Sequence, residues 1–214
     1  VYLHACGGEE AAKEKGAEIE FIHLLDWDIQ YCSGCVACSR GLVMGKGMIC
    51  SRQDDFKAFY EKVVEADGVL FVDPIFESGA TGLYHSITDR MGPGHDTGMM
   101  KMLDGKLKEA GKEGLNPRYF RQKALSFVGI GGSDWAVRCE TDHAMFALSP
   151  GWKVVNNEFF SWCKDVIMQD DKVERMKEIG RNLADAAQQI IDEDMQIEGS
   201  EKTPLWKGKE GACP

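Results

Sequence analysis

Two short, predominantly apolar runs are the feature that most limits how this chain can fold. They lie at residues 68–73 (GVLFVD) and 123–129 (KALSFVG). A predominantly apolar run of this length is typical of a strand buried on both faces of a sheet. Residues 51–66 and 170–194 show the apolar spacing of amphipathic helices. Strands that alternate with helices predict an α/β fold, in which a parallel sheet is covered on both faces and binds ligands at the carboxyl ends of its strands.

Weaker patterns predict the remaining elements. Helices are expected over residues 1–15, 81–91, 99–110 and 139–148, and strands over residues 18–24 and 152–160. Gly16 is expected to end the first helix, and Gly92 to Gly94 to end the helix that starts at Thr81. Residues 25–50 are predicted to form a long loop that contains four cysteines.

The composition argues against several classes of protein. A chain of 214 residues suits one domain, which we place at residues 1–195, followed by a polar tail at residues 196–214. Its 25 basic and 35 acidic residues leave a net charge of −10, which argues against nucleic acid as a partner. Apolar runs stay far below the ~20 residues that span a bilayer, and no secretion signal is evident at Val1. We therefore expect a cytoplasmic protein.

The long loop contains Cys32, Cys35, Cys38 and Cys50, with the spacing C-x2-C-x2-C-x11-C. Gaps of two residues let one tight turn direct three thiolates at a single centre, and the fourth cysteine completes a set of four sulfur ligands. Iron–sulfur clusters use such runs, whereas structural zinc usually uses two separated C-x2-C pairs. The spacing therefore favours a cluster, with a zinc site or plain reduced thiols as alternatives.

Two loops at the carboxyl ends of the buried strands could hold a flat cofactor. The first consists of Pro74, Ile75, Phe76, Glu77, Ser78 and Gly79, and the second includes Gly131, Gly132, Ser133, Asp134 and Trp135. Ile75, Phe76 and Trp135 offer apolar surface, while backbone N–H groups next to glycine can bond the polar edge of a ring. Each loop alone is a weak signal, because strand-to-helix turns with glycine are common. Together, at adjacent strand ends, they predict a cofactor cleft.

The residues from Gly16 to Arg90 resemble those of the flavodoxin-fold NADPH-dependent FMN reductases, and specifically the iron–sulfur flavoproteins of anaerobic microbes. The matching pieces are GAEIEFIHL, DWDIQYCSGCVACSRG, and the stretch that runs from DDFKAFYEK through GVLFVDPIFESG to HSITDR. The strand KALSFVGIGG is similar to the one that precedes the third flavin loop of the family. The resemblance covers about residues 1–195 and implies a flavodoxin-like, doubly wound parallel sheet.

The resemblance also implies cofactors and a site for each. It implies bound FMN, with residues 74–79 lining the flavin ring and residues 131–135 covering its other edge. It implies a [4Fe–4S] cluster next to the flavin, with the four cysteines of the long loop as ligands. Homodimers or homotetramers are expected, in which the cluster loop of one subunit approaches the flavin of another.

The chain departs from the family pattern in three places. The last gap in the cysteine motif is longer than usual, which makes Cys50 the least secure ligand. Residues 92–119 form an insertion, expected to act as a lid or an interface. The first strand and its phosphate loop are absent, so we expect residues before Val1 that this sequence omits.

Cys213-Pro214 resembles the first half of a C-P-x-C knuckle, which predicts a truncated rubredoxin-like or zinc-ribbon extension.

Other candidate side chains have ordinary interpretations. His85 and His95 could donate to a flavin or a substrate, although a solvated or capped imidazole is the commoner role. Cys139 and His143 are spaced for one helical face, where core packing is the commoner role. Arg90 is expected to form a salt bridge at a helix end.

These observations predict an oxidoreductase that depends on FMN and a [4Fe–4S] cluster. We expect electrons to pass between a donor such as NAD(P)H or ferredoxin and an acceptor that the sequence does not indicate. No catalytic side-chain acid or base is required for this transfer, because the flavin carries the chemistry. The alternatives are a cluster-free NAD(P)H:quinone or flavin reductase, and a non-enzymatic electron-transfer subunit of a larger redox complex.

Overall fold

A parallel three-stranded sheet with the order β1-β2-β3 forms the centre of the molecule. The computed structural model describes residues 2–46, 50–163, 169–195, 197 and 207–208. The strands are β1 (Gly68–Pro74), β2 (Ala124–Ile130) and β3 (Lys153–Phe160). Phe71 of β1 pairs with Phe127 of β2, which pairs in turn with Asn157 of β3. The expected buried strands and the α/β class are confirmed.

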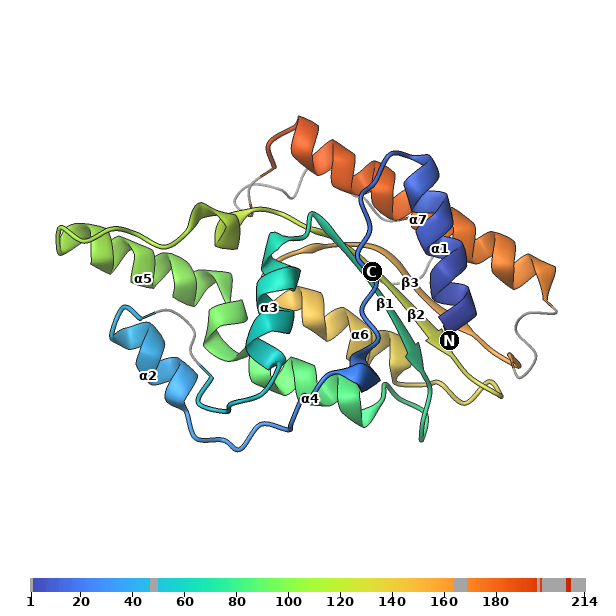
Figure 1. Ribbon diagram of the computed structural model, residues 1–214, viewed down its shortest axis with the longest axis horizontal. Coiled ribbons are helices and arrows are strands. Elements are labelled where there is room, and N and C mark those ends of the chain that lie inside the picture. Colours follow the sequence, from blue (N-terminus) through green and yellow to red (C-terminus); the bar gives the residue numbers. More distant parts are fainter. Residues whose placement is uncertain (1, 47–49, 164–168, 196, 198–206, 209–214) are drawn as a thin grey trace.

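Helices cover both faces of this sheet (Figure 1). The longer ones are α1 (Tyr2–Glu14), α3 (Phe56–Glu65), α4 (Gly82–Met91), α5 (Thr97–Glu109), α6 (Cys139–Leu148) and α7 (Asp170–Asp192). Shorter ones are α2 (Ala37–Val43) and the 3-10 turns η1 (Leu24–Asp26), η2 (Gly92–His95) and η3 (Pro117–Phe120). The helices α1 and α7 lie side by side on one face, while α3, α4 and α6 pack on the other. The doubly wound arrangement is therefore confirmed.

The core has a separate apolar layer on each face of the sheet. On the side of α3, α4 and α6, Phe71 and Phe127 stack with ring centroids 5.6 Å apart, and Phe146 meets Phe71 edge-on. On the other side, α7 buries Met176 and Ile179 against Val128 of β2. The alternation of side chains along each strand supplies both layers, which explains why β1 and β2 are mostly apolar.

The insertion at residues 92–119 packs against the cysteine loop. It contains η2, α5 and η3, and α5 buries Met100, Leu103 and Leu107 against Leu42 of α2. This apolar contact supports the helix that follows Cys35 and contains Cys38. The insertion therefore stabilises the part of the chain that holds the cysteines.

Several expected boundaries are wrong. Residues 18–24 do not form a strand, because β1 pairs only with β2 in the described part of the chain and a strand needs a ladder partner. Ile22 and Leu24 pack instead against the core on the side of α3. The loop at residues 25–50 contains a short helix, α2, and the helix expected from residue 51 begins at Phe56.

Most of the expected tail, residues 196–214, lies outside the described residues, including Cys213 and Pro214. Two described positions contact the domain: the N–H of Ile197 donates to Phe120, and the N–H of Lys207 donates to Val155 of β3. Within the residues that the structure describes, no helix has the length and apolar character needed to cross a membrane.

Candidate functional site

The loop after β1 holds a strained turn. Glu77 and Ser78 both have left-handed backbone angles, with φ of 47° and 66°. Phe76 and Gly79 flank them and exchange two backbone hydrogen bonds of 3.3 Å and 3.2 Å. This φ pattern belongs to type I′ turns, which usually use Asn or Gly at the two central positions. Left-handed residues with side chains cost about 1–2 kcal/mol each, and such strain collects at ligand sites.

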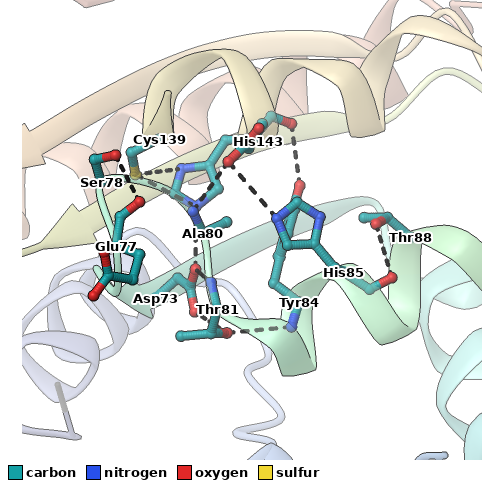
Figure 2. A network of polar contacts seen from close by, with 11 residues as sticks. Asp73, Glu77, Ser78, Ala80, Thr81, Tyr84, His85, Thr88, Cys139 and His143 are labelled. Atoms are coloured by element: carbon teal, nitrogen blue, oxygen red, sulfur yellow. Dashed lines mark hydrogen bonds and ion pairs between the residues drawn. The ribbon is translucent and has the colours of Figure 1, made fainter. Parts of the chain in front are cut away.

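A buried carboxylate fixes the two ends of this loop. Asp73, the last residue before it, accepts hydrogen bonds from the N–H (2.8 Å) and the hydroxyl (2.7 Å) of Thr81. Figure 2 shows the fully buried His143 between the Asp73 carboxylate, 3.6 Å away, and the sulfur of Cys139, also 3.6 Å away. Burial raises the pKa of the Cys139 thiol to about 12, so this sulfur stays protonated and inert. Cys139 and His143 are therefore core residues behind the loop.

The loop after β2 lies directly beside the first one. The N–H of Ile75 donates to Ile130 at 2.9 Å, and the N–H of Arg138 donates to Ser78 at 3.0 Å. A Cβ added to Gly131 would meet the ring of Phe159 at 3.0 Å, which explains glycine there. The loops that begin after β1 and β2 therefore start side by side at the carboxyl ends of adjacent strands.

The exposed surface of these two loops fits a flat ring with polar edges. The side chains of Phe76 and Trp135 are 65% and 77% exposed, although both are large and apolar. No acceptor within the described residues bonds the N–H groups of Glu77 and Ser78 at the tip of the turn. Exposed rings beside free backbone donors are the groups that a flavin would engage. The residues present therefore fit FMN.

Two charged side chains lie against the same loop. A Cβ on Gly79 would come within 2.7 Å of both the Arg138 guanidinium and the Asp142 carboxylate. Asp142 also accepts a hydrogen bond from the N–H of Ala80 at 3.1 Å and lies 3.7 Å from His85. His85 thus lies beside the loop, as its position after the loop suggested.

The four cysteines of the long loop line one pocket. The helix α2 holds Cys38, the irregular segment before it holds Cys32 and Cys35, and Cys50 lies beyond the gap of eleven residues. Among the described residues, no group of three or more His, Cys, Asp or Glu side chains is close enough together to hold a metal ion as it stands. The structure thus places all four cysteines on the wall of one pocket.

Hydrogen-bond donors surround the cysteine sulfurs. The Cys35 sulfur lies 3.1 Å from the Ser51 hydroxyl, and the N–H of Gly34 donates to the Cys32 sulfur at 3.4 Å. Hydrogen bonds, the largest contribution coming from Ser51 and smaller ones from the Ala37 backbone and Ser33, lower the pKa of the Cys35 thiol to about 7. Sulfurs that accept hydrogen bonds in this way suit an all-thiolate iron–sulfur cluster. The residues of this pocket therefore fit the expected cluster.

The helix α4 joins the two sites within one chain. Thr81 caps its start, where the loop after β1 ends, and Arg90 in its last turn lines the cysteine pocket. A helix of 10 residues is about 15 Å long. The flavin-type loops and the cysteine pocket of one chain therefore lie at opposite ends of α4.

Sequence reasoning missed several residues that shape these sites. Asp73 and Asp142 anchor the first loop, and Asp54 forms a buried ion pair with Arg90 beside the cysteines. The expected salt bridge of Arg90 is confirmed, but it is buried. An acidic residue at the end of an apolar strand, such as Asp73, is a signal that could have been used.

His95 is not part of either site. Its ring is buried between Phe146 and Trp152, and its Nε2 lies 2.7 Å from the carbonyl oxygen of Phe146. Burial lowers the pKa of His95 from 6.5 to about 4. The imidazole is therefore neutral in the folded protein at neutral pH.

This burial predicts a loss of stability in acid. Below pH 6.5 the unfolded chain binds a proton at His95, whereas the folded protein does not until about pH 4. The free energy of unfolding should therefore fall by about 3 kcal/mol as the pH drops from 6.5 to 4. Urea unfolding at pH 7 and pH 4.5 should show a smaller loss in His95→Gln than in the unchanged protein. Equal losses in both proteins would contradict this assignment.

The fold and its sites define a class of protein. A doubly wound parallel sheet with paired loops at adjacent strand ends is the architecture of flavodoxin-like α/β proteins. Residues 8–165 match the family described as NADPH-dependent FMN reductase. The chain belongs to this family of flavin-dependent oxidoreductases.

Curated relatives of this chain are named iron-sulfur flavoproteins, the branch of the family that the sequence resembles. An iron-sulfur flavoprotein of Archaeoglobus fulgidus is 30% identical over 127 residues, which cover 59% of this chain and 53% of that protein. The iron-sulfur flavoprotein MJ0731 of Methanocaldococcus jannaschii is 32% identical over 78 residues, covering 36% of this chain and 37% of that protein. The matched regions thus span about half or less of these relatives.

Solved structures show the same fold. A structure titled flavone reductase has a TM-score of 0.79 and 37% sequence identity, and the match covers 99% of this chain and 63% of that one. An NADH:FMN oxidoreductase, EMOB, in its apo form has a TM-score of 0.52 at 16% identity, covering 84% of this chain and 78% of that one. The second similarity concerns the fold alone.

Proposed function

We propose that the protein is an oxidoreductase that binds FMN and a [4Fe–4S] cluster and passes electrons between a donor such as NAD(P)H or ferredoxin and an organic acceptor. The observation that supports this most is that Cys32, Cys35, Cys38 and Cys50 all line one pocket despite the long gap in sequence. Family membership and the names of the relatives support the flavin and the cluster respectively.

The two adjacent loops would hold the flavin. Residues 74–79 and 131–135 would contact its ring, with Phe76 and Trp135 supplying apolar surface. The N–H groups of Glu77 and Ser78 would donate to the polar edge of the ring. Asp73 holds Thr81 and so keeps the strained turn in place before the cofactor arrives. When bound, FMN accepts a hydride and exchanges single electrons, chemistry that no side chain of this protein supplies.

The four cysteines would hold the cluster. A set of four thiolates with short gaps in sequence favours iron and sulfide over zinc. The Gly34 N–H and the Ser51 hydroxyl, which lie next to the Cys32 and Cys35 sulfurs, would tune the reduction potential of the cluster. Because the two sites of one chain lie at opposite ends of α4, an oligomer in which the cysteine loop of one subunit meets the flavin of another would shorten the electron path. We therefore propose a homodimer or homotetramer.

The acceptor that we propose to test first is a flat conjugated carbonyl compound. The solved structure titled flavone reductase covers nearly all of this chain at 37% identity, which favours flavone as the probe. A quinone is the comparison compound, because a cluster-free quinone or flavin reductase is the second candidate function. Turnover with either compound would exclude a role as an electron carrier alone.

Anaerobic purification of the protein tests the proposal directly. We expect one FMN and about four irons per chain, with matching sulfide. Flavin without iron would establish the cluster-free reductase, and zinc in place of iron would remove the cluster from the proposal. Oxidation of NAD(P)H with flavone and with a quinone should then be measured in the same preparation. Fast electron exchange with ferredoxin and no turnover would favour the carrier role.

A further inference from the structure

Arg90 forms a buried ion pair beside the cysteine pocket. It lies in the last turn of α4 and is 3% exposed, and its partner Asp54 has a fully buried side chain. The Arg90 Nη1 and Nη2 atoms donate to the two carboxylate oxygens of Asp54, the second at 2.8 Å. The guanidinium also lies over the ring of Phe56, 4.2 Å from its centroid. Its position is therefore fixed by contacts on several sides.

The same guanidinium contacts both ends of the cysteine loop. Nη1 donates to the carbonyl oxygen of Gln30 at 3.0 Å, and Nη2 donates to the sulfur of Cys50 at 3.0 Å. Asp54 accepts a hydrogen bond from the N–H of Gln30, also at 3.0 Å. Gln30 stands two residues before Cys32, while Asp54 stands four residues after Cys50. The ion pair thus joins the segment before the first cysteine to the segment that contains the last.

These bonds explain how Cys50 can lie near the other three cysteines across a gap of eleven residues. Cys32, Cys35 and Cys38 are close in sequence, whereas the position of Cys50 depends on contacts that are distant in sequence. The bonds from Arg90 to Gln30 and Cys50 supply those contacts, because they hold the two segments beside one pocket. A guanidinium suits a sulfur that carries negative charge, as a cluster ligand does.

We propose that Arg90 is a positioning residue that places Cys50 in the ligand set and donates a hydrogen bond to its sulfur in the cluster-bearing protein. The inference rests on the proposed function, since it concerns the same cluster. Hydrogen bonds to ligand sulfurs stabilise the reduced, more negative state of a cluster. Arg90 therefore raises the reduction potential of the cluster. It also helps the protein to retain the cluster.

The test compares Arg90→Gln with Asp54→Asn in the full chain, purified without oxygen. Arg90→Gln removes the donor to Cys50, whereas Asp54→Asn weakens the same ion pair and leaves that donor in place. We expect Arg90→Gln to lose iron, or to retain a cluster of lower reduction potential, while FMN content is unchanged. Asp54→Asn should keep its iron, with a potential that is not lowered. Arg90→Lys should lie between Arg90→Gln and the unchanged protein, because an ammonium has three N–H donors, whereas Arg90 makes four hydrogen bonds to Asp54, Gln30 and Cys50.

Several outcomes would overturn the inference. Folded Arg90→Gln with the iron content and potential of the unchanged protein would do so, as would equal losses in Arg90→Gln and Asp54→Asn. If Arg90→Gln does not fold, the double variant D54N/R90Q removes both buried charges and takes the same measurements. In a Cys50→Ser background, Arg90→Gln should lower the iron content no further. Iron missing from the unchanged protein would instead refute the proposed function, so the two failures are distinguishable.

Discussion

Replacing Cys38 with serine should remove most of the iron from the protein and leave FMN bound. Cys38 is held by α2 on the wall of the cysteine pocket, and its sulfur lies near Gly92 at the start of η2. A serine hydroxyl is a poor ligand for iron in a cluster that uses thiolates. The flavin-type loops lie at the other end of α4 and contain no part of this pocket. Iron, sulfide and flavin should be measured per chain after anaerobic purification.

Cys163→Ser is the matched control. Cys163 is a buried cysteine outside the pocket, and its sulfur lies 3.3 Å from the carbonyl oxygen of Ser161, which a serine hydroxyl can also bond. We expect this variant to keep its full iron content. Four irons retained in Cys38→Ser would take Cys38 out of the ligand set, and iron lost equally from both variants would show that the loss is not specific to the pocket.

The sheet and most helices could be predicted because their causes are local. The apolar runs at β1 and β2 and the amphipathic pattern of α7 need no knowledge of neighbours. Residues 18–24 have an equally clear alternating pattern, but a strand also requires a partner at hydrogen-bond distance. In the described part of the chain β1 pairs only with β2, so this segment stays outside the sheet. Whether a strand finds a partner depends on the whole fold, so the pattern of one segment cannot predict it.

The candidate sites were predictable to a similar extent. The spacing of Cys32, Cys35 and Cys38 indicates a shared centre by itself, whereas the approach of Cys50 depends on the buried bond from Arg90, which is distant in sequence. The strain at Glu77 and Ser78 was also invisible, because neither residue type signals a left-handed backbone. Residue types and short spacings thus predict where the proposed sites lie, and long-range contacts decide how their residues are held.

The glycines of α1 show how a local pattern can hide a packing role. Glycine lowers helix propensity, so by local pattern alone Gly7 and Gly8 weaken the first helix. In the structure Gly8 is buried where α1 meets α7, and a Cβ on Gly180 of α7 would collide with the carbonyl oxygen of Gly8. Small residues on both helices therefore allow their backbones to approach closely, so that both helices cover one face of the sheet.

This contact predicts that Gly180→Ala destabilises the protein by about 3 kcal/mol or more, because a backbone atom cannot move aside as a flexible side chain can. Helix propensity alone predicts the opposite sign, a gain of about 1 kcal/mol when alanine replaces glycine inside a helix. The free energy of unfolding of the variant, from urea titration, decides between the two effects.

Gly105→Ala provides the control for propensity, because Gly105 lies inside α5 and a Cβ there would have no neighbour within 4 Å. We expect this variant to be more stable than the unchanged protein by up to about 1 kcal/mol. Opposite signs for two identical substitutions would show that the close approach of α1 and α7 requires Gly180. A neutral or stabilising Gly180→Ala would mean that the two helices can separate at little cost, and that the face of the sheet beneath them is less tightly covered than the structure indicates.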